Sequence, residues 1–178
     1  MRHIIKTKDI TITGIGIALF VALSFVIRVP VFENYYICLG YVVMAVYLYS
    51  VGTIHGTLVG MFGVFIYCLL ISGLRGMPGW ILANIAIGVV LGYVMKKTKG
   101  IHNRKVATGI QIIAVVLSVA IGILVIKSGV ECFLYGQPFW LRTANNIYAF
   151  IADIVTLILS LPFCYMLDSR IKKIVNEQ

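Results

Sequence analysis

The polar side chains with the clearest chemical role lie in the last third of the chain. Arg142, Asn146 and Asp153 are spaced four and seven residues apart, so a helix carries all three on roughly one side. A carboxylate inside an apolar segment costs roughly 2.5–3.5 kcal/mol on membrane-insertion scales. We therefore expect Asp153 to face the interior of a bundle, where it either binds a ligand or makes a structural hydrogen bond to a neighbouring helix.

A second polar face is predicted earlier in the chain. Trp80 and Asn84 are four residues apart, and Gly88 and Gly92 continue the same spacing. An indole offers a stacking surface and an amide both donates and accepts hydrogen bonds, a combination that suits a small-molecule pocket. In the alternative interpretation, Trp80 belongs to an interfacial aromatic belt and the glycines serve close helix packing.

Cysteine and histidine, which commonly bind metals in proteins, are scattered along this sequence at Cys38, Cys68, Cys132, Cys164, His3, His55 and His102. They make no metal-ligand spacing, and we expect neither a metal site nor a cofactor in the chain. Asp153 has no companion serine–histidine pair or second buried acid, which argues against an intramembrane enzyme.

Composition defines the broad class. Of the 178 residues, 61% are hydrophobic and 12% are charged, and the mean hydropathy is +1.01. These values exclude a soluble globular domain and predict an all-α integral membrane protein with a single transmembrane domain, residues 1–178. The net charge of +9 is concentrated in particular loops and therefore reports orientation rather than nucleic-acid binding.

The apolar runs predict six transmembrane helices, because a helix of about 20 residues crosses a bilayer. They are expected at about 10–28, 37–51, 57–73, 79–95, 106–126 and 145–167. The longest loop, about 127–144, contains Trp140 and is predicted to form an interfacial cap.

The positive charges predict the orientation of this bundle. With both termini in the cytoplasm, the inner segments carry eleven Lys and Arg residues and the outer segments carry four. This asymmetry agrees with the positive-inside rule. It also gathers the aromatic loops at the outer face.

The first apolar helix carries a stripe of small residues, Gly14, Ala18 and Ala22, spaced four apart. Small side chains let another helix approach closely, which is how helices associate in lipid. The stripe is either a docking surface for a partner or a packing face against a helix of the same chain.

These features together resemble the S components of energy-coupling factor (ECF) transporters. The resemblance rests on a six-helix chain of fewer than 200 residues, on Ala18-x-x-x-Ala22, and on the Pro-Gly-Trp that opens the fourth helix. Residues 39–44 (LGYVVM) and 76–92 (GMPGWILANIAIGVVLG) are most similar to the riboflavin-type group.

The resemblance implies a vitamin-binding subunit in the bacterial plasma membrane. Such a subunit docks on one transmembrane coupling protein and two ATP-binding cassette ATPases, captures substrate outside, and topples in the bilayer to release it. The chain would use no ATP itself, and it has no Gly-x-x-x-x-Gly-Lys-Ser/Thr phosphate loop. Ala18 and Ala22 would contact the coupling protein, and Gly14 would extend that stripe.

The resemblance also places a substrate pocket near the outer surface, capped by loops. The residues at the corresponding positions are Trp80, Asn84, Asn146, Asp153, Arg142, Arg75, Tyr35, Tyr36 and Trp140. Their types suit an uncharged or mildly cationic heteroaromatic compound, such as a flavin, a B6 vitamer or a pyrimidine. Arg75 and Arg142 either bind a carboxylate or phosphate, or pair with Glu33, Glu131 or lipid headgroups. A small carrier or channel that works without an ATPase is the alternative function.

Overall fold

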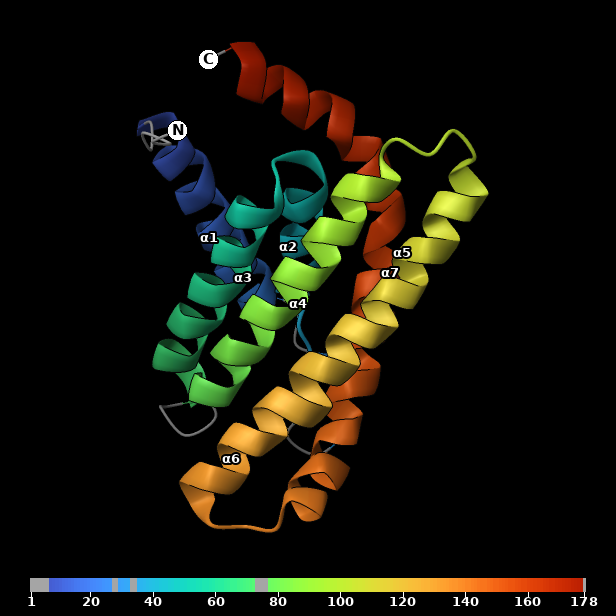
Figure 1. Cartoon of the computed structure of the whole chain (residues 1–178). Coiled ribbons are helices and arrows are strands. Elements are labelled where there is room, and N and C mark those ends of the chain that lie inside the picture. Colours follow the sequence, from blue (N-terminus) through green and yellow to red (C-terminus); the bar gives the residue numbers. More distant parts are fainter. Residues whose placement is uncertain (1–6, 27–28, 33–34, 73–76, 178) are drawn as a thin grey trace, which may run out of the picture.

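The computed structural model describes residues 7–26, 29–32, 35–72 and 77–177. Its helices are α1 (Thr7–Val26), α2 (Gly40–Ser50), α3 (Thr53–Tyr67), α4 (Met77–Thr98), α5 (Arg104–Val119), α6 (Ser128–Tyr135) and α7 (Phe139–Glu177). Two π-helical segments, η1 (Cys68–Ser72) and η2 (Ala120–Lys127), extend α3 and α5. In the described part of the chain, these segments join into six helical rods, which confirms the predicted all-α class (Figure 1).

Five of these rods are long and apolar enough to cross a membrane. The exception is α2, whose 11 residues span about 16 Å and are shorter than a hydrocarbon core of about 30 Å. Nine of its residues are buried, because α1, α3, α4 and α7 surround it. The second predicted span is therefore a central core helix.

The segment before α2 is a small hairpin. Strand β1 (Val29–Phe32) pairs antiparallel with β2 (Tyr35–Ile37), and Val29 lies opposite Ile37. The sequence predicted only a loop here. Its β-branched and aromatic residues favour extended backbone, and Pro30 opposes a helix.

The prediction of a long loop over 127–144 is wrong. Residues Arg104–Tyr135 run as one apolar helix, and only residues 136–138 connect it to α7. Gly136 ends the helix in a left-handed conformation (φ 62°) and donates its N–H to the Cys132 carbonyl at 3.0 Å. The Pro138 carbonyl then accepts the first hydrogen bonds of α7.

The break between the second and third predicted helices is confirmed. Gly52 adopts φ 141°, a conformation that favours glycine, and it separates α2 from α3. The remaining boundaries move by one to four residues, except that α7 continues to Glu177, ten residues beyond the predicted end at 167.

Glycines on α4 allow close packing against α3. A Cβ on Gly88 would lie 2.9 Å from the Thr57 Cα, and one on Gly92 would lie 2.8 Å from the Thr53 Cγ2. These distances are too short for any side chain. Of the two interpretations of Gly88 and Gly92, the structure supports helix packing.

The beginning of α1, the turn between α4 and α5, and the end of α7 lie at one end of the bundle, and α6 lies at the other (Figure 1). Lys96, Lys97, Lys99, Arg104 and Lys105 are at or next to that turn. The assignment of this end to the cytoplasm remains a prediction from the positive-inside rule.

Candidate functional site

Tyr41 is the centre of a buried polar cluster that lies between α2, α4 and α7. Its side chain is fully buried, and its hydroxyl oxygen accepts hydrogen bonds from Trp80 Nε1 at 2.9 Å and Asn84 Nδ2 at 3.3 Å. A hydroxyl has two acceptor positions and one proton to donate. The Asp153 side chain, which is 5% exposed, interacts with the same hydroxyl.

In the Asn84 side-chain amide, the nitrogen has hydrogen-bond partners and the oxygen has none among the described residues. The NH₂ group donates to Tyr41 and to the Trp80 carbonyl, the latter at 2.9 Å. The carbonyl oxygen, Oδ1, is buried and has no hydrogen-bond partner among the described residues. A buried acceptor in this state costs about 1–3 kcal/mol unless a ligand or water supplies a donor.

A second set of polar groups surrounds Asn146, where α6 meets α7. Lys127 Nζ donates to Asn146 Oδ1 at 2.6 Å, and Asn146 Nδ2 donates to Ser128 Oγ at 3.0 Å and to Glu131 Oε2 at 3.1 Å. Both ends of this amide are thus used within the protein. Asn146 therefore positions its neighbours.

Charges in this region balance one another. Glu131 lies 3.6 Å from Lys127 Nζ and 4.0 Å from Arg142 Nη1. Lys127 also acts electrostatically on Asp153, so it connects the Asn146 set with the Tyr41 set. Two cations and two carboxyl groups thus lie together in this part of the site. We call the residues Tyr41, Trp80, Asn84, Lys127, Glu131, Arg142, Asn146 and Asp153 the polar cluster.

Arg142 has a defined place in the polar cluster. Its guanidinium lies 4.7 Å from the Tyr135 ring centroid, and its Nε is buried without a partner among the described residues. Glu131, one of the partners considered from the sequence, lies beside Arg142 in the structure.

The structure thus gathers five of the predicted pocket residues: Trp80, Asn84, Arg142, Asn146 and Asp153. Trp140 does not join them, since its side chain is 79% exposed and contacts Phe139. Tyr35 and Tyr36 lie in β2, which runs beside α7. Arg75 and Glu33 lie outside the described residues.

Three members of the polar cluster were not predicted as pocket residues: Tyr41, Lys127 and Glu131, of which Glu131 was considered only as an ion-pair partner of an arginine. The signal for two of them was present, because Lys127 and Glu131 are four residues apart, the spacing of an ion pair on a helix. The incorrect loop prediction hid that spacing. Tyr41 stands in an apolar run, with no signal that separates it from a core tyrosine.

The small-residue stripe on α1 faces away from the rest of the chain. Gly14, Ala18 and Ala22 are exposed, and a Cβ on Gly14 would meet no atom within 4 Å. The packing face of α1 is a different one, formed by Thr13, Gly16, Phe20 and Ser24. Within the described structure, the stripe therefore has no helix packed against it.

An apolar bundle with a buried polar cluster is typical of a membrane subunit that binds a small molecule. The sequence profile of the family described as "ECF-type riboflavin transporter, S component" matches residues 4–168. The chain belongs to this family, and it is a multi-pass membrane transport component rather than an enzyme.

Individual proteins are also similar to this chain. A UPF0397 protein of Lactococcus lactis subsp. cremoris is 30% identical over 149 residues, which cover 80% of this chain and 77% of the relative. A UPF0397 protein of Streptococcus thermophilus is 37% identical over 93 residues, covering 51% of this chain and 49% of the relative. The crystal structure of the S component for biotin from an ECF-type ABC transporter superposes with a TM-score of 0.65 at 19% identity and 95% coverage of both chains. This likeness shows the fold.

Proposed function

We propose that the chain is the substrate-binding S component of an ECF-type ABC transporter that takes up a vitamin or related heteroaromatic micronutrient. The polar cluster captures the compound from outside the cell. Docking on the ATP-driven ECF module, made of one coupling protein and two ATPases, then lets the subunit topple and release its substrate inside. The observation that carries the proposal is the buried Asn84 oxygen without a hydrogen-bond partner, beside Tyr41, Trp80 and Asp153.

The chemistry of the polar cluster supports a neutral or weakly cationic ligand. Because Glu131 already lies beside both Lys127 and Arg142, a strongly anionic ligand would have to compete with a buried carboxylate for these two cations. Asn84 Oδ1 has no partner among the described residues and can accept a hydrogen bond from a ligand N–H or O–H. Arg142 Nε likewise has no partner there and can donate to an acceptor on the ligand. A nitrogen heterocycle that carries both kinds of group meets these demands.

Among such compounds, riboflavin and vitamins with a B6 or pyrimidine ring fit this chemistry best. The family description names riboflavin, whereas the structural relative is an S component for biotin. The two names differ, so our substrate assignment rests on the polar cluster and on the family description.

The test is a calorimetric titration of the purified chain with a panel of vitamins, after native mass spectrometry for co-purified ligands. The panel contains flavins, B6 vitamers, thiamine precursors, pantothenate and cobalamin. We expect one heteroaromatic compound to bind tightly and the acidic pantothenate not to bind. Preferential binding of pantothenate, or no binding by folded protein, would contradict the proposed substrate class.

A further inference from the structure

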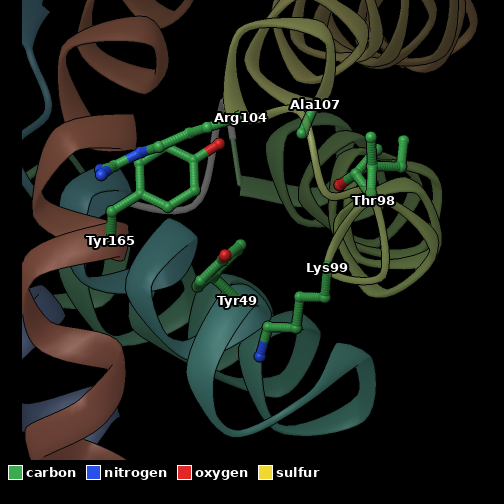
Figure 2. A pocket seen from close by; sticks show the side chains of 7 residues that line it. Tyr49, Thr98, Lys99, Arg104, Ala107 and Tyr165 are labelled. Atoms are coloured by element: carbon green, nitrogen blue, oxygen red, sulfur yellow. The ribbon is translucent and has the colours of Figure 1, made fainter.

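A second polar region lies at the opposite end of the bundle from α6. A pocket of about 230 Å³ opens there, and its polar lining comes from Tyr49, Thr98, Lys99, Arg104 and Tyr165 (Figure 2). We call it the basic pocket. Trp80 and Thr98 are at opposite ends of α4, 18 residues and about 27 Å apart, so the basic pocket is distinct from the polar cluster.

Each cation of the basic pocket lies against an aromatic ring. Lys99 Nζ is 4.4 Å from the Tyr49 ring centroid, and Arg104 Cζ is 4.2 Å from the Tyr165 ring centroid. The two rings pack edge to face with centroids 5.3 Å apart. Cation–π contacts restrict both side chains without neutralising their charge.

Positive charge is in excess around the basic pocket. Asp168 accepts from Lys99 at 3.3 Å and from Lys172 at 2.5 Å, so one carboxylate is shared by two ammonium groups. Arg104 has no carboxylate within ion-pair distance among the described residues. Burial lowers the pKa of Lys99 below its usual value even though Asp168 acts in the opposite direction. The positive charge on Lys99 is therefore incompletely compensated, and a further anion would stabilise it.

A chain of hydrogen bonds holds two residues that line the basic pocket, Tyr165 and Thr98. The Tyr165 hydroxyl donates to Gln111 Oε1 at 2.8 Å and lies 3.0 Å from Thr108 Oγ1, while Gln111 Nε2 donates to Thr98 Oγ1 at 2.8 Å. This network fixes the Tyr165 ring and, through it, the Arg104 guanidinium. An anion would thus meet cations that are already in place.

We propose that the basic pocket binds a phosphate group, and that its source is the headgroup of an anionic phospholipid. A planar guanidinium together with an ammonium is a combination suited to phosphate oxygens. The pocket lies at the ends of two membrane-spanning helices, since Lys99 directly follows the Met77–Thr98 span and Arg104 begins the Arg104–Tyr135 span. This is the level at which lipid headgroups begin.

The proposal is tested by thermal unfolding of the full-length protein in neutral detergent. Phosphatidylglycerol, phosphatidylcholine or inorganic phosphate is titrated in at constant ionic strength. We expect phosphatidylglycerol to raise the unfolding midpoint in a saturable way and phosphatidylcholine to leave it unchanged. Equal stabilisation by inorganic phosphate would support a phosphate-binding site but would contradict the proposal that the phosphate belongs to a lipid headgroup. No saturable effect of either phosphate compound would overturn the proposal.

Single substitutions separate the basic pocket from general surface charge. Arg104→Gln and Lys99→Gln should each weaken the phosphatidylglycerol effect at least about fivefold, since one basic residue near a headgroup contributes about 1 kcal/mol. Lys105→Gln is the matched control, because it removes the same charge from an exposed neighbour that does not line the pocket. An equal loss in the control would show diffuse attraction only and refute the site.

Two further measurements serve as controls: a charge-conserving variant of Arg104 and the binding of the vitamin. If Arg104→Gln does not fold, Arg104→Lys keeps the charge but loses the planar group, and we expect it to bind less tightly than the native protein and more tightly than Lys99→Gln. Vitamin binding at the polar cluster should be unchanged in all the folded variants. The proposal of a phosphate site and the proposal of a transport function can therefore be refuted independently of each other.

Discussion

At the scale of single residues, the orientation of the Asn84 amide is fixed by its neighbours. The Trp80 carbonyl can only accept a hydrogen bond, so the nitrogen of Asn84 must face it and the oxygen must point elsewhere. That oxygen is buried and has no partner among the described residues. A ligand that donates a hydrogen bond to this oxygen would recover the free energy lost there, and we therefore expect Asn84 to contact the substrate.

Replacement of Asn84 by alanine should therefore weaken vitamin binding about tenfold or more, the order of effect expected for a buried hydrogen bond. Calorimetric titration measures the change. Asn145→Ala is the matched control, since Asn145 is exposed on α7 beside the polar cluster. Unchanged affinity in Asn84→Ala would remove Asn84 from the binding site.

Two substitutions of Asp153 separate the effect of its charge from the effect of its hydrogen bonding. Asp153→Asn keeps an acceptor for the Tyr41 hydroxyl and deletes the charge, whereas Asp153→Ala deletes both. We expect both variants to bind the vitamin more weakly and the alanine variant to lose more. Equal affinities in the three proteins would give Asp153 a purely structural role.

The sequence predicted much of the polar cluster because helical periodicity links residues of one element. Arg142, Asn146 and Asp153 share one side of α7, and Trp80 and Asn84 share one side of α4, as expected. Periodicity carries no information on what another helix brings to the same place. Tyr41 therefore became visible only in the folded chain.

At the scale of elements, the long rod of α5, η2 and α6 explains the largest error of the sequence analysis. Lys127, Ser128 and Glu131 look like loop residues by composition. In the structure they end a membrane helix and face inward, where Asn146 and Arg142 compensate them. Composition shows that these residues are polar, but only the packing of α6 on α7 shows that they face the interior of the bundle.

The ion pair between Lys127 and Glu131 should stabilise that packing. Lys127→Met leaves Glu131 buried beside one cation instead of two, and removing one partner of a buried pair costs about 3–5 kcal/mol. We expect a lower thermal unfolding midpoint and partial recovery in the double variant Lys127→Met, Glu131→Gln. Lys105→Met, exposed on the same rod, should have little effect. Additive losses in the double variant would refute the coupling.

The exposed stripe on α1 also makes an element-scale prediction. Ala18→Leu and Ala22→Leu place bulk on a face that no described residue covers, so folding and vitamin binding should be retained. If the coupling protein docks there, uptake should be abolished, because close helix approach needs small residues. Ala144→Leu, an exposed alanine on α7, serves as the control. Loss of binding together with uptake would contradict a docking role.

At the scale of the whole molecule, the proposed tasks are separated. The polar cluster includes residues of η2, α6 and the beginnings of α4 and α7, and the basic pocket lies at the turn between α4 and α5. That turn and α6 are at opposite ends of the bundle (Figure 1), and the stripe is exposed on α1. Composition predicted this membrane bundle and its six rods, because apolar length is a direct consequence of bilayer thickness. It could not predict the burial of the short α2, which depends on the four helices around it.

This separation predicts that the chain binds its substrate alone but does not transport it alone. Release inside requires the polar cluster to be carried or opened across the bilayer, and the sequence has no phosphate loop with which to use ATP for that work. In vesicles, uptake of the bound vitamin should therefore require both the ECF module and ATP. Vesicles that contain the chain without the module should bind the vitamin and show no accumulation. Accumulation by the chain alone, without ATP, would instead establish the stand-alone carrier, and the α1 stripe would then have no coupling role, because no coupling protein would be needed.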